Sequence, residues 1–164
     1  MSFFRNPRNV VIIGLTAVLV VIAVYAVLLN DTPGSVTSPP PATFTVNGKT
    51  YAFNYTASDN AERAAGLMNE KVTNATTMLF AFPSMGTYEF WMYDTNTSLD
   101  IIWINATGNM GRVVYVYTDA LPCRSIDILC PDYGSSALAN YVIEARAGFA
   151  AANDLGVGTR ILFG

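Results

Sequence analysis

Four acidic residues next to apolar segments are the first candidates for chemistry: Glu62, Asp94, Asp100 and Glu144. Two carboxyl groups held about 5–9.5 Å apart can hydrolyse a glycosidic bond, one as an acid and the other as a base or nucleophile. The chain contains no histidine, which excludes serine–histidine and cysteine–histidine nucleophile pairs. The spacing of the four acids along the chain does not predict that any two of them lie at that distance. We therefore expect no catalytic residues and keep a carboxylate-based hydrolase as an alternative.

A binding site for a glycan or another small ligand is a second possibility, because aromatic residues dominate such sites and gather in one segment of this chain. Residues 89–104 read EFWMYDTNTSLDIIWI, two apolar runs on either side of a short polar connection. The predicted ligand-binding residues are Trp91, Asp94, Thr95, Asp100, Trp103 and Glu144. Runs of this kind more often form buried strands. A buried Asp100 would then need hydrogen bonds to its carboxylate and would hold a turn.

Sulfur-containing side chains offer soft metal ligands. A Cu(I) site is a further alternative, built from five thioethers: Met68, Met78, Met85, Met92 and Met110. Methionine more often fills irregular gaps in a hydrophobic core. The two cysteines lack CxxC spacing and the chain has no histidine, which argues against zinc. We expect no bound metal and no cofactor.

Cys123 and Cys130 lie in one loop between Pro122 and Pro131. In an oxidising compartment, two thiols this close in the chain are expected to form a disulfide. Two buried, reduced cysteines are the alternative, since a free cysteine behaves as a small apolar residue.

The N-terminal segment predicts a membrane anchor. Residues 10–29 carry no charge, and twenty residues in a helix span about 30 Å, the thickness of bilayer hydrocarbon. A cleaved signal peptide has a shorter apolar core and a small-residue cleavage site, and this segment lacks that site. Arg5 and Arg8 precede the apolar run, so the positive-inside rule places residues 1–9 in the cytoplasm and residues 30–164 outside the cell membrane.

Asn-x-Ser/Thr sequons agree with this outward orientation, because N-glycosylation acceptors suit an external surface. The candidate acceptors are Asn30, Asn54, Asn74, Asn96 and Asn105. A single sequon arises easily by chance in a chain rich in threonine, so the indication comes from their number.

The chain is acidic beyond the predicted anchor. It has 9 Lys and Arg and 12 Asp and Glu; Arg5 and Arg8 precede the anchor, which leaves 7 basic against 12 acidic residues and a net charge of −5. Nucleic acid binding needs clustered Lys and Arg, so we expect no nucleic acid partner. The expected partners are the membrane itself and either subunits of a membrane complex or an envelope polymer.

The remaining sequence divides into a linker and one domain. Residues 30–42 read NDTPGSVTSPPPA, a Pro-rich linker with an extended backbone. The domain covers residues 43–164. Asn47-Gly48 between alternating apolar residues predicts a hairpin, and Asp59-Asn60-Ala61-Glu62 is typical of a capping box that opens a short helix.

Strands dominate the rest of the domain. They are predicted over residues 77–82, 88–93, 99–105, 112–118, 141–145 and 158–162, and a second helix over 147–155. These elements predict a mostly β (α+β) fold: a compact antiparallel sheet or partly closed barrel with two short helices, preceded by one transmembrane helix.

A series of motifs in this chain resembles the DUF192 family over residues 44–162. The motifs are Glu62-Arg63, Gly66-Leu67-Met68, Met78-Leu79-Phe80, Phe82, Phe90-Trp91-Met92, Thr95, Leu99-Asp100-Ile101, Pro122-Cys123, Tyr141-Val142, Glu144 and Leu155-Gly156-Val157-Gly158. Either Asp94 stands where the family usually has Asn, with two residues added before Leu99, or Asn96-Thr97 matches the family's Asn-Thr and the two added residues follow Met92. Thr159 replaces an Asp near the end. The family has no settled activity, so the resemblance implies a domain but no reaction.

Together these features predict a single-pass, extracytoplasmic DUF192-like protein. We expect it to act without catalysis, as an accessory subunit or interaction module of a membrane or cell-envelope assembly. Recognition of a glycan or small ligand, Cu(I) binding and carboxylate-based hydrolysis are the alternatives.

Overall fold

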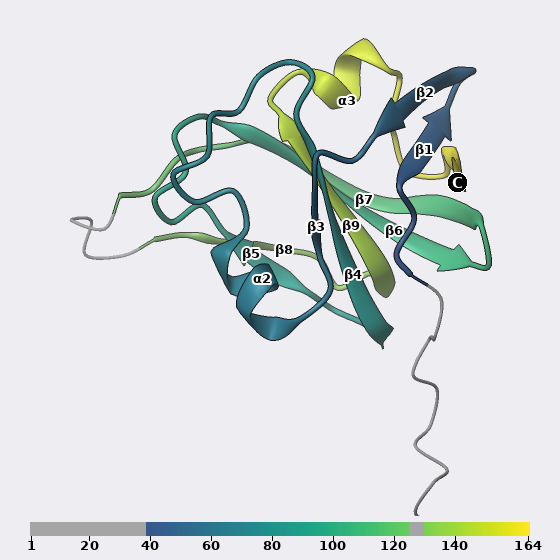
Figure 1. Ribbon diagram of the computed structural model, residues 1–164, viewed down its shortest axis with the longest axis horizontal. Helices are drawn as coiled ribbons and strands as arrows, with labels where there is room; N and C mark the ends of the chain where they lie inside the picture. The colour runs from purple at the N-terminus through teal and green to yellow at the C-terminus, as the bar shows by residue number, and fades with distance from the viewer. Residues whose placement is uncertain (1–38, 125–129) are drawn as a thin grey trace, which may run out of the picture. The chain divides into compact units, whose positions relative to one another are not determined.

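The computed structural model describes residues 39–124 and 130–164, which form a curled β-sheet with two short helices (Figure 1). Eight strands follow the order β2-β1-β10-β7-β6-β9-β4-β3, and β5 and β8 form a separate two-stranded sheet. The elements are β1 (Thr43–Val46), β2 (Lys49–Ala52), β3 (Tyr55–Ala57), α2 (Asn60–Ala65), β4 (Thr77–Gly86), β5 (Glu89–Trp91), β6 (Leu99–Thr107), β7 (Met110–Ala120), β8 (Asp132–Gly134), β9 (Ala139–Arg146), α3 (Phe149–Ala152) and β10 (Arg160–Phe163). The predicted mostly β fold with two short helices is confirmed.

The sheet is mixed rather than purely antiparallel, because β3 pairs with β4 in parallel. The other strand pairs are antiparallel. Neither β3 nor β8 was predicted from the sequence. Each has three residues, which is too short for a periodic pattern of apolar residues to show.

The β1–β2 hairpin confirms the turn predicted at Asn47 and Gly48. Their φ angles are 48° and 79°. A two-residue hairpin turn of type I′ needs positive φ at both central positions, and asparagine and glycine adopt this conformation with little strain. The turn sets the register, in which Val46 pairs with Lys49 and Phe44 with Tyr51.

The predicted capping box begins helix α2. Asp59 Oδ1 accepts a hydrogen bond from the Glu62 N–H at 2.8 Å, and Glu62 Oε2 accepts one from the Asp59 N–H at 3.2 Å. Gly66, with φ of 49°, ends the helix. The helix itself contains no buried residue, whereas Leu67 just beyond it is 2% exposed. The chain after α2 therefore anchors the helix to the domain.

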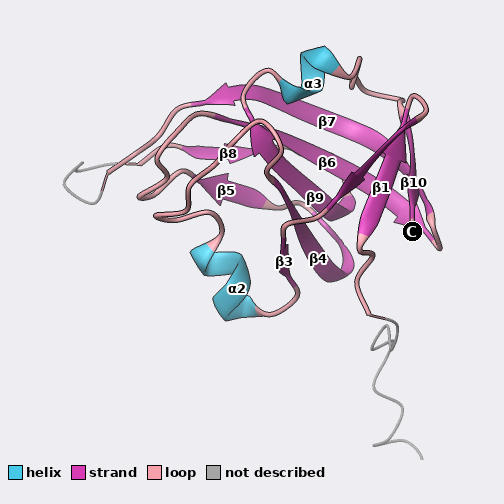
Figure 2. Cartoon of the chain, turned by 45° about the horizontal axis from the view of Figure 1, so that its top comes forward, coloured by secondary structure: helices cyan, strands magenta, loops and turns pink. Residues whose placement is uncertain are grey.

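The sheet separates two hydrophobic cores, because successive side chains of a strand point to opposite faces. The α3 core contains Phe44, Leu79, Ile102, Ile143 and Phe149. The β5–β8 core contains Met78, Phe80, Ile101, Trp103 and Val142. Figure 2 shows α3 on one side of the long strands and α2 with β5 and β8 on the other. Strand β6 lies between both cores, which explains its almost uninterrupted apolar sequence.

The two outermost strands of the sheet, β2 and β3, are joined by only Phe53 and Asn54. Such a connection spans at most about 11 Å, so the curl brings the two sheet edges close together at this point. Thr77 holds the connection: its Oγ1 donates to the Ala52 carbonyl at 2.7 Å, its carbonyl accepts from the Asn54 N–H at 2.9 Å, and its N–H donates to Asn54 Oδ1 at 2.8 Å. The sheet is a half-barrel held together at this seam.

The predicted transmembrane segment, residues 10–29, lies outside the described residues, as do most of the predicted linker and Asn30. Within residues 39–124 and 130–164, no helix has the length and apolar character needed to cross a bilayer.

Candidate functional site

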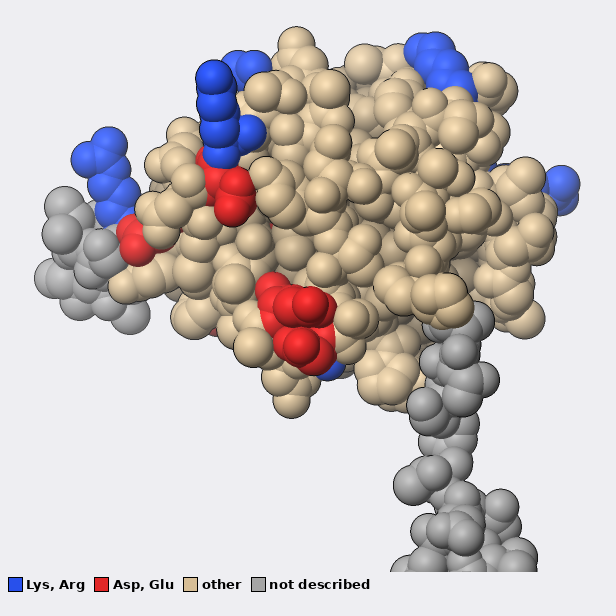
Figure 3. Space-filling view, in the orientation of Figure 1, with Lys and Arg blue, Asp and Glu red and all other residues tan. Residues whose placement is uncertain are grey.

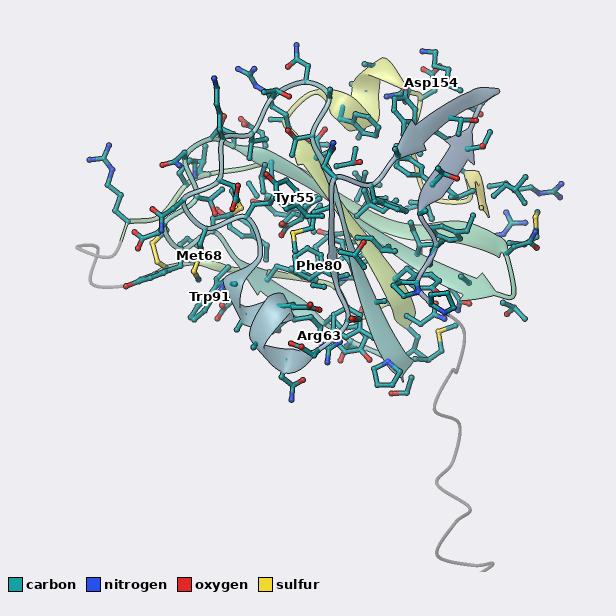
Figure 4. The ribbon with its side chains drawn as sticks, in the orientation of Figure 1. Tyr55, Arg63, Met68, Phe80, Trp91 and Asp154 are labelled. Atoms are coloured by element: carbon teal, nitrogen blue, oxygen red, sulfur yellow. A yellow bond between two sulfur atoms is a disulfide. The ribbon has the colours of Figure 1, made fainter. Side chains whose placement is uncertain are left out.

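Two adjoining hollows lie beside α2, on the sheet face that holds the β5–β8 core. The outer cleft has a volume of about 340 Å³, and its lining includes Arg63, Phe82, Tyr88, Glu89, Trp91 and Asp132. The inner chamber has a volume of about 20 Å³, and its lining includes Leu67, Met68, Tyr93, Thr95 and Glu144. Both are also lined by Arg63, Phe80, Phe90 and Trp91, so they share a wall. In Figure 4, Arg63, Met68, Phe80 and Trp91 lie around α2.

The carboxyl group of Glu144, on β9, borders the inner chamber. Its register partners are Met78 on β4 and Ile101 on β6, both apolar, and the residue is 3% exposed. Among the residues that the structure describes, nothing forms a hydrogen bond or ion pair with this carboxyl. Burial raises the pKa of Glu144 to about 8, because the charged form loses its water without gaining a partner. At neutral pH the group is therefore mostly an uncharged carboxylic acid.

Asp100, on β6, is equally buried but lies on the opposite face of the sheet. It pairs in register with Ala145, the residue after Glu144, so the two acids point into different cores. Asp100 Oδ1 accepts from the Asp119 N–H at 3.0 Å, and Oδ2 accepts from the Ala150 N–H at 2.8 Å. Its carboxylate thus ties the end of β7 and the start of α3 to the central strand.

Arg63 is held at the junction of the two hollows by neighbours on both sides. Nη1 donates to the Ala81 carbonyl and Nη2 to Asn60 Oδ1, each at 2.8 Å. The guanidinium carbon lies 5.2 Å from the centre of the Phe82 ring, in a cation–π arrangement. These contacts place a fixed positive charge at the mouth of the chamber.

Aromatic rings form the walls. Phe80 on β4 and Phe90 on β5 meet edge to face with ring centres 4.9 Å apart. Trp91 follows Phe90 and, because side chains alternate along a strand, turns away from the core. It is 49% exposed, and its ring centre lies 5.6 Å from that of Tyr93. Trp91 thus offers an accessible indole face at the boundary of the cleft and the chamber.

The wall that contains Tyr93 is fixed to the cysteine loop. The Asp94 N–H donates to the Cys123 carbonyl at 2.7 Å, and the Cys123 N–H donates to the Met92 carbonyl at 2.9 Å. The predicted disulfide between Cys123 and Cys130 is present. Asp94 has φ of 47°, in the left-handed region that Asp and Asn tolerate best after glycine. Either Asp or Asn can adopt this conformation.

Three of the six predicted ligand-binding residues meet at the hollows: Trp91, Thr95 and Glu144. Trp103 instead lies in the β5–β8 core with no exposure, and its Nε1 donates to the Tyr88 carbonyl at 2.9 Å. Asp94 supports the wall through its backbone, and Asp100 faces the α3 core. Ligand binding by these residues stays a prediction.

Of the four acids considered for hydrolysis, Glu144 is the one found in the lining of the inner chamber. Glu62 is occupied at the helix cap, where backbone N–H groups of Ser58 and Asp59 lower the pKa of its carboxyl. Asp100 points to the other face. The structure therefore does not bring Glu144 together with Glu62 or Asp100 into a catalytic pair.

The five methionines occupy different environments. Met78 and Met92 are buried in the β5–β8 core, and Met68 lines the inner chamber. Met85 and Met110 are exposed on β4 and β7, strands that β6 and β9 separate. Within residues 39–124 and 130–164, no cluster of three or more His, Cys, Asp or Glu side chains has the arrangement of a metal site.

Four of the five predicted glycosylation acceptors fall within the described residues, and all four are exposed: Asn54, Asn74, Asn96 and Asn105. Asn30 lies outside that range. Attachment of a glycan is sterically open at these positions and stays a prediction.

A third hollow, of about 390 Å³, lies near α3 and includes Lys49, Tyr51 and Arg146 in its lining. Its polar groups already bond protein atoms: Lys49 Nζ lies 3.4 Å from Asn153 Oδ1, and Arg146 Nη1 donates to Asn74 Oδ1 at 3.1 Å. This hollow presents basic side chains, whereas the inner chamber has the carboxyl of Glu144.

The sequence-based set missed four residues that shape the hollows: Arg63, Phe80, Phe90 and Tyr93. The first three belong to motifs that carry the DUF192 resemblance. Grouping the motif residues as one site, rather than weighing the aromatic segment alone, could have identified them.

Solved structures share this fold. A protein of unknown function from Novosphingobium aromaticivorans is 24% identical, with a TM-score of 0.61 over 77% of this chain and 88% of its own. A proposed transcription regulator from Sinorhizobium meliloti is 22% identical, with a TM-score of 0.62 over 77% of this chain and 97% of its own. No curated protein matches the chain. The sequence profile of DUF192, described as Uncharacterized ACR, matches residues 42–163. Since that match covers most of the sequence, the chain belongs to the DUF192 family.

Proposed function

We propose that this chain is a single-pass membrane protein whose DUF192 domain lies outside the cell membrane and binds a ligand or partner without catalysis. The observation that carries the proposal is the unpartnered carboxyl of Glu144 beside an aromatic-lined cleft. Within the described residues no fully buried side-chain oxygen lacks a hydrogen-bond partner, so the Glu144 carboxyl, which has none, is open to the chamber that it lines. A polar group in such a position is available to bond a ligand. A ligand that bonds this group would supply the missing partner.

The proposed location rests on features of different origin. The apolar segment 10–29 has the length of a transmembrane helix, and the basic residues before it favour a cytoplasmic N-terminus. The disulfide suits an oxidising compartment. The exposure of four sequons is compatible with glycosylation. Residues 30–42 would then act as a spacer between membrane and domain.

A role in a membrane or cell-envelope assembly fits the surface of the domain. Figure 3 shows that most of one face carries neither acidic nor basic side chains. Such a face can be covered by a partner without removing many charges from water. The Sinorhizobium meliloti protein is described as a proposed transcription regulator. DNA binding does not suit the present chain, which has a net charge of −5 beyond residue 30.

Recognition of a glycan is a second candidate function, favoured by the half-exposed ring of Trp91. An indole face can lie against the apolar side of a sugar ring while nearby polar groups bond its hydroxyls. Glu89, Asp132 and Arg63 line the same outer cleft and could supply those hydrogen bonds.

Purification of the full chain from its native membrane in mild detergent, followed by mass spectrometry, tests the proposal. We expect co-purifying membrane subunits at a fixed stoichiometry, or bound carbohydrate, and less of either with Trp91→Ala. Asp154→Asn is the matched control, because Asp154 is exposed near α3 and lines neither the outer cleft nor the inner chamber (Figure 4). Recovery of the chain with neither subunits nor carbohydrate would contradict a binding role.

Protease treatment of intact cells tests the orientation separately. Residues 43–164 should be accessible to an external protease if the domain lies outside the membrane. Protection of these residues in intact cells, with cleavage after lysis, would overturn the proposed location.

A further inference from the structure

We propose that the inner chamber receives a protonated amine, the ammonium head of a small ligand whose remaining part lies in the outer cleft. The inference rests on the proposed binding function and names the chemical class of the ligand. The size of the chamber, its aromatic walls and the carboxyl group that borders it favour an amine.

The chamber matches a single small polar group. Its volume of about 20 Å³ is close to the space that one water molecule needs. An ammonium group is similar in size, whereas a phosphate or a sugar ring is not. A larger ligand would therefore insert only its head and leave the rest in the adjoining cleft of about 340 Å³.

The aromatic side chains of the walls favour a cation, whereas Arg63 at the mouth carries a positive charge of its own. Phe80, Phe90, Trp91 and Tyr93 surround the chamber, and the face of an aromatic ring attracts a positive charge within about 6 Å. Trp91 also lines the outer cleft, so the same ring can contact the ligand on both sides of the passage.

Glu144 supplies the counter-charge. An ammonium beside this carboxyl favours its ionised form. Binding below the pKa of Glu144 then transfers the carboxyl proton to solvent, and the carboxylate and the ammonium form a pair. The elements packed around Glu144 provide no other cation at this position: Met78 on β4 and Ile101 on β6 are apolar.

Two other titratable groups face the chamber, Arg63 from α2 and the Tyr93 phenol from the segment after β5. Arg63 is bonded to Ala81 and Asn60 at the mouth, and it contributes no resolved effect on the pKa of Glu144, for which burial is the cause. The positive charge of Arg63 therefore does not replace the ligand's ammonium at the carboxyl.

Calorimetric titration of the full chain in detergent micelles tests the inference with paired probes. The amines are N-acetyl-lysine methylamide and glucosamine; their neutral counterparts are N-acetyl-norleucine methylamide and glucose. We expect at least one amine to bind about tenfold or more tightly than its counterpart. Comparison of the two amines distinguishes a chain-borne from a sugar-borne ammonium group.

Titrations at pH 6.5 in two buffers with different ionisation heats measure how many protons are released when an amine binds. Release of about one proton per bound amine is expected, because Glu144 is mostly protonated in the free protein at that pH. Glu144→Gln keeps the shape of the side chain but cannot ionise, so it should lose both the proton release and about tenfold in affinity for the amine. Asp154→Asn, also a change from carboxyl to amide, should behave as the wild type.

Equal binding of amines and their neutral counterparts, binding without proton release, or no amine binding at millimolar concentration would each overturn the inference. None of these results bears on the Trp91-dependent co-purification, which tests the binding function itself. An intact thermal transition of Glu144→Gln shows that a loss of binding in this variant does not come from unfolding.

Discussion

Two buried acids in neighbouring strands differ in one respect. Asp100 on β6 has no exposure and accepts hydrogen bonds from two backbone N–H groups. Glu144 on β9 is 3% exposed and has no bonding partner in the described part of the chain. Burial therefore does not distinguish a structural acid from a functional one. The partners of the carboxyl group make that distinction, since a satisfied acid holds the fold and an unsatisfied one has capacity to bind.

The difference follows from what each face of the sheet offers. On the face of the α3 core, the end of β7 and the start of α3 present N–H groups to Asp100. On the other face, Glu144 meets apolar strand neighbours and the chamber beside α2. We therefore expect substitutions of the two acids to have opposite consequences.

The pH dependence of stability should show the largest effect. The pKa of Glu144 in the folded protein, about 8, lies above its ordinary value of 4.5, so the native state keeps a proton that the unfolded chain releases. The contribution of Glu144 to stability is then complete below pH 4.5 and is lost as the pH rises to 8, by roughly 4 kcal/mol. Urea unfolding of Glu144→Gln should lack this loss. If the free energies of unfolding of the wild type and Glu144→Gln changed in the same way with pH, Glu144 would not differ from Asp100 in the way described.

Asp100→Ala should destabilise the fold by about 3 kcal/mol, because one buried and one partly buried N–H group lose their acceptor. Urea unfolding at pH 7 measures the loss, and Glu144→Gln at the same pH should not be less stable than the wild type. A loss below about 1 kcal/mol for Asp100→Ala would mean that water replaces the carboxylate, and Asp100 would not be a structural acid.

Removal of the disulfide should affect the sheet face that holds the β5–β8 core and Glu144 more than the face that holds the α3 core and Asp100. The paired substitutions Cys123→Ser and Cys130→Ser should cost about 2 kcal/mol for a loop of this length. Hydrogen exchange should quicken at the amide of Asp94, which is bonded to residue 123. The amides of Asp119 and Ala150 are bonded to Asp100. Their exchange should quicken only as far as the lower free energy of unfolding of the whole domain requires. Equal acceleration at all three amides would contradict separate behaviour of the two sides.

Trp91→Ala should have the smallest effect on stability, within about 0.5 kcal/mol, because the side chain is 49% exposed. Its effect should appear in ligand or partner retention instead. A loss of several kcal/mol in the free energy of unfolding would assign Trp91 to the core. Trp91 would then not be an accessible ring in the outer cleft.

Local features of the fold could be predicted from the sequence, whereas the candidate site could be predicted only in part. The Asn47-Gly48 turn and the Asp59–Glu62 capping box depend on residues a few positions apart, and both were predicted. Glu144 was included in the predicted site, but so was Asp100. Their separation depends on strand register and on N–H groups contributed by distant segments, which sequence spacing does not contain. Trp91 and Trp103 were grouped for the same reason, although one is exposed and the other buried.

The seam between β2 and β3 has a consequence for association of this protein with itself. An open sheet usually offers two edge strands, and each can add a strand from another molecule and start aggregation. Here both edges belong to one short stretch, residues 49–57, and Thr77 bonds to both sides of its connection. A foreign strand entering at the seam would have to displace those bonds. The domain can thus be crowded on a surface, as the proposed anchoring requires, without presenting a free template for edge-to-edge polymerisation there.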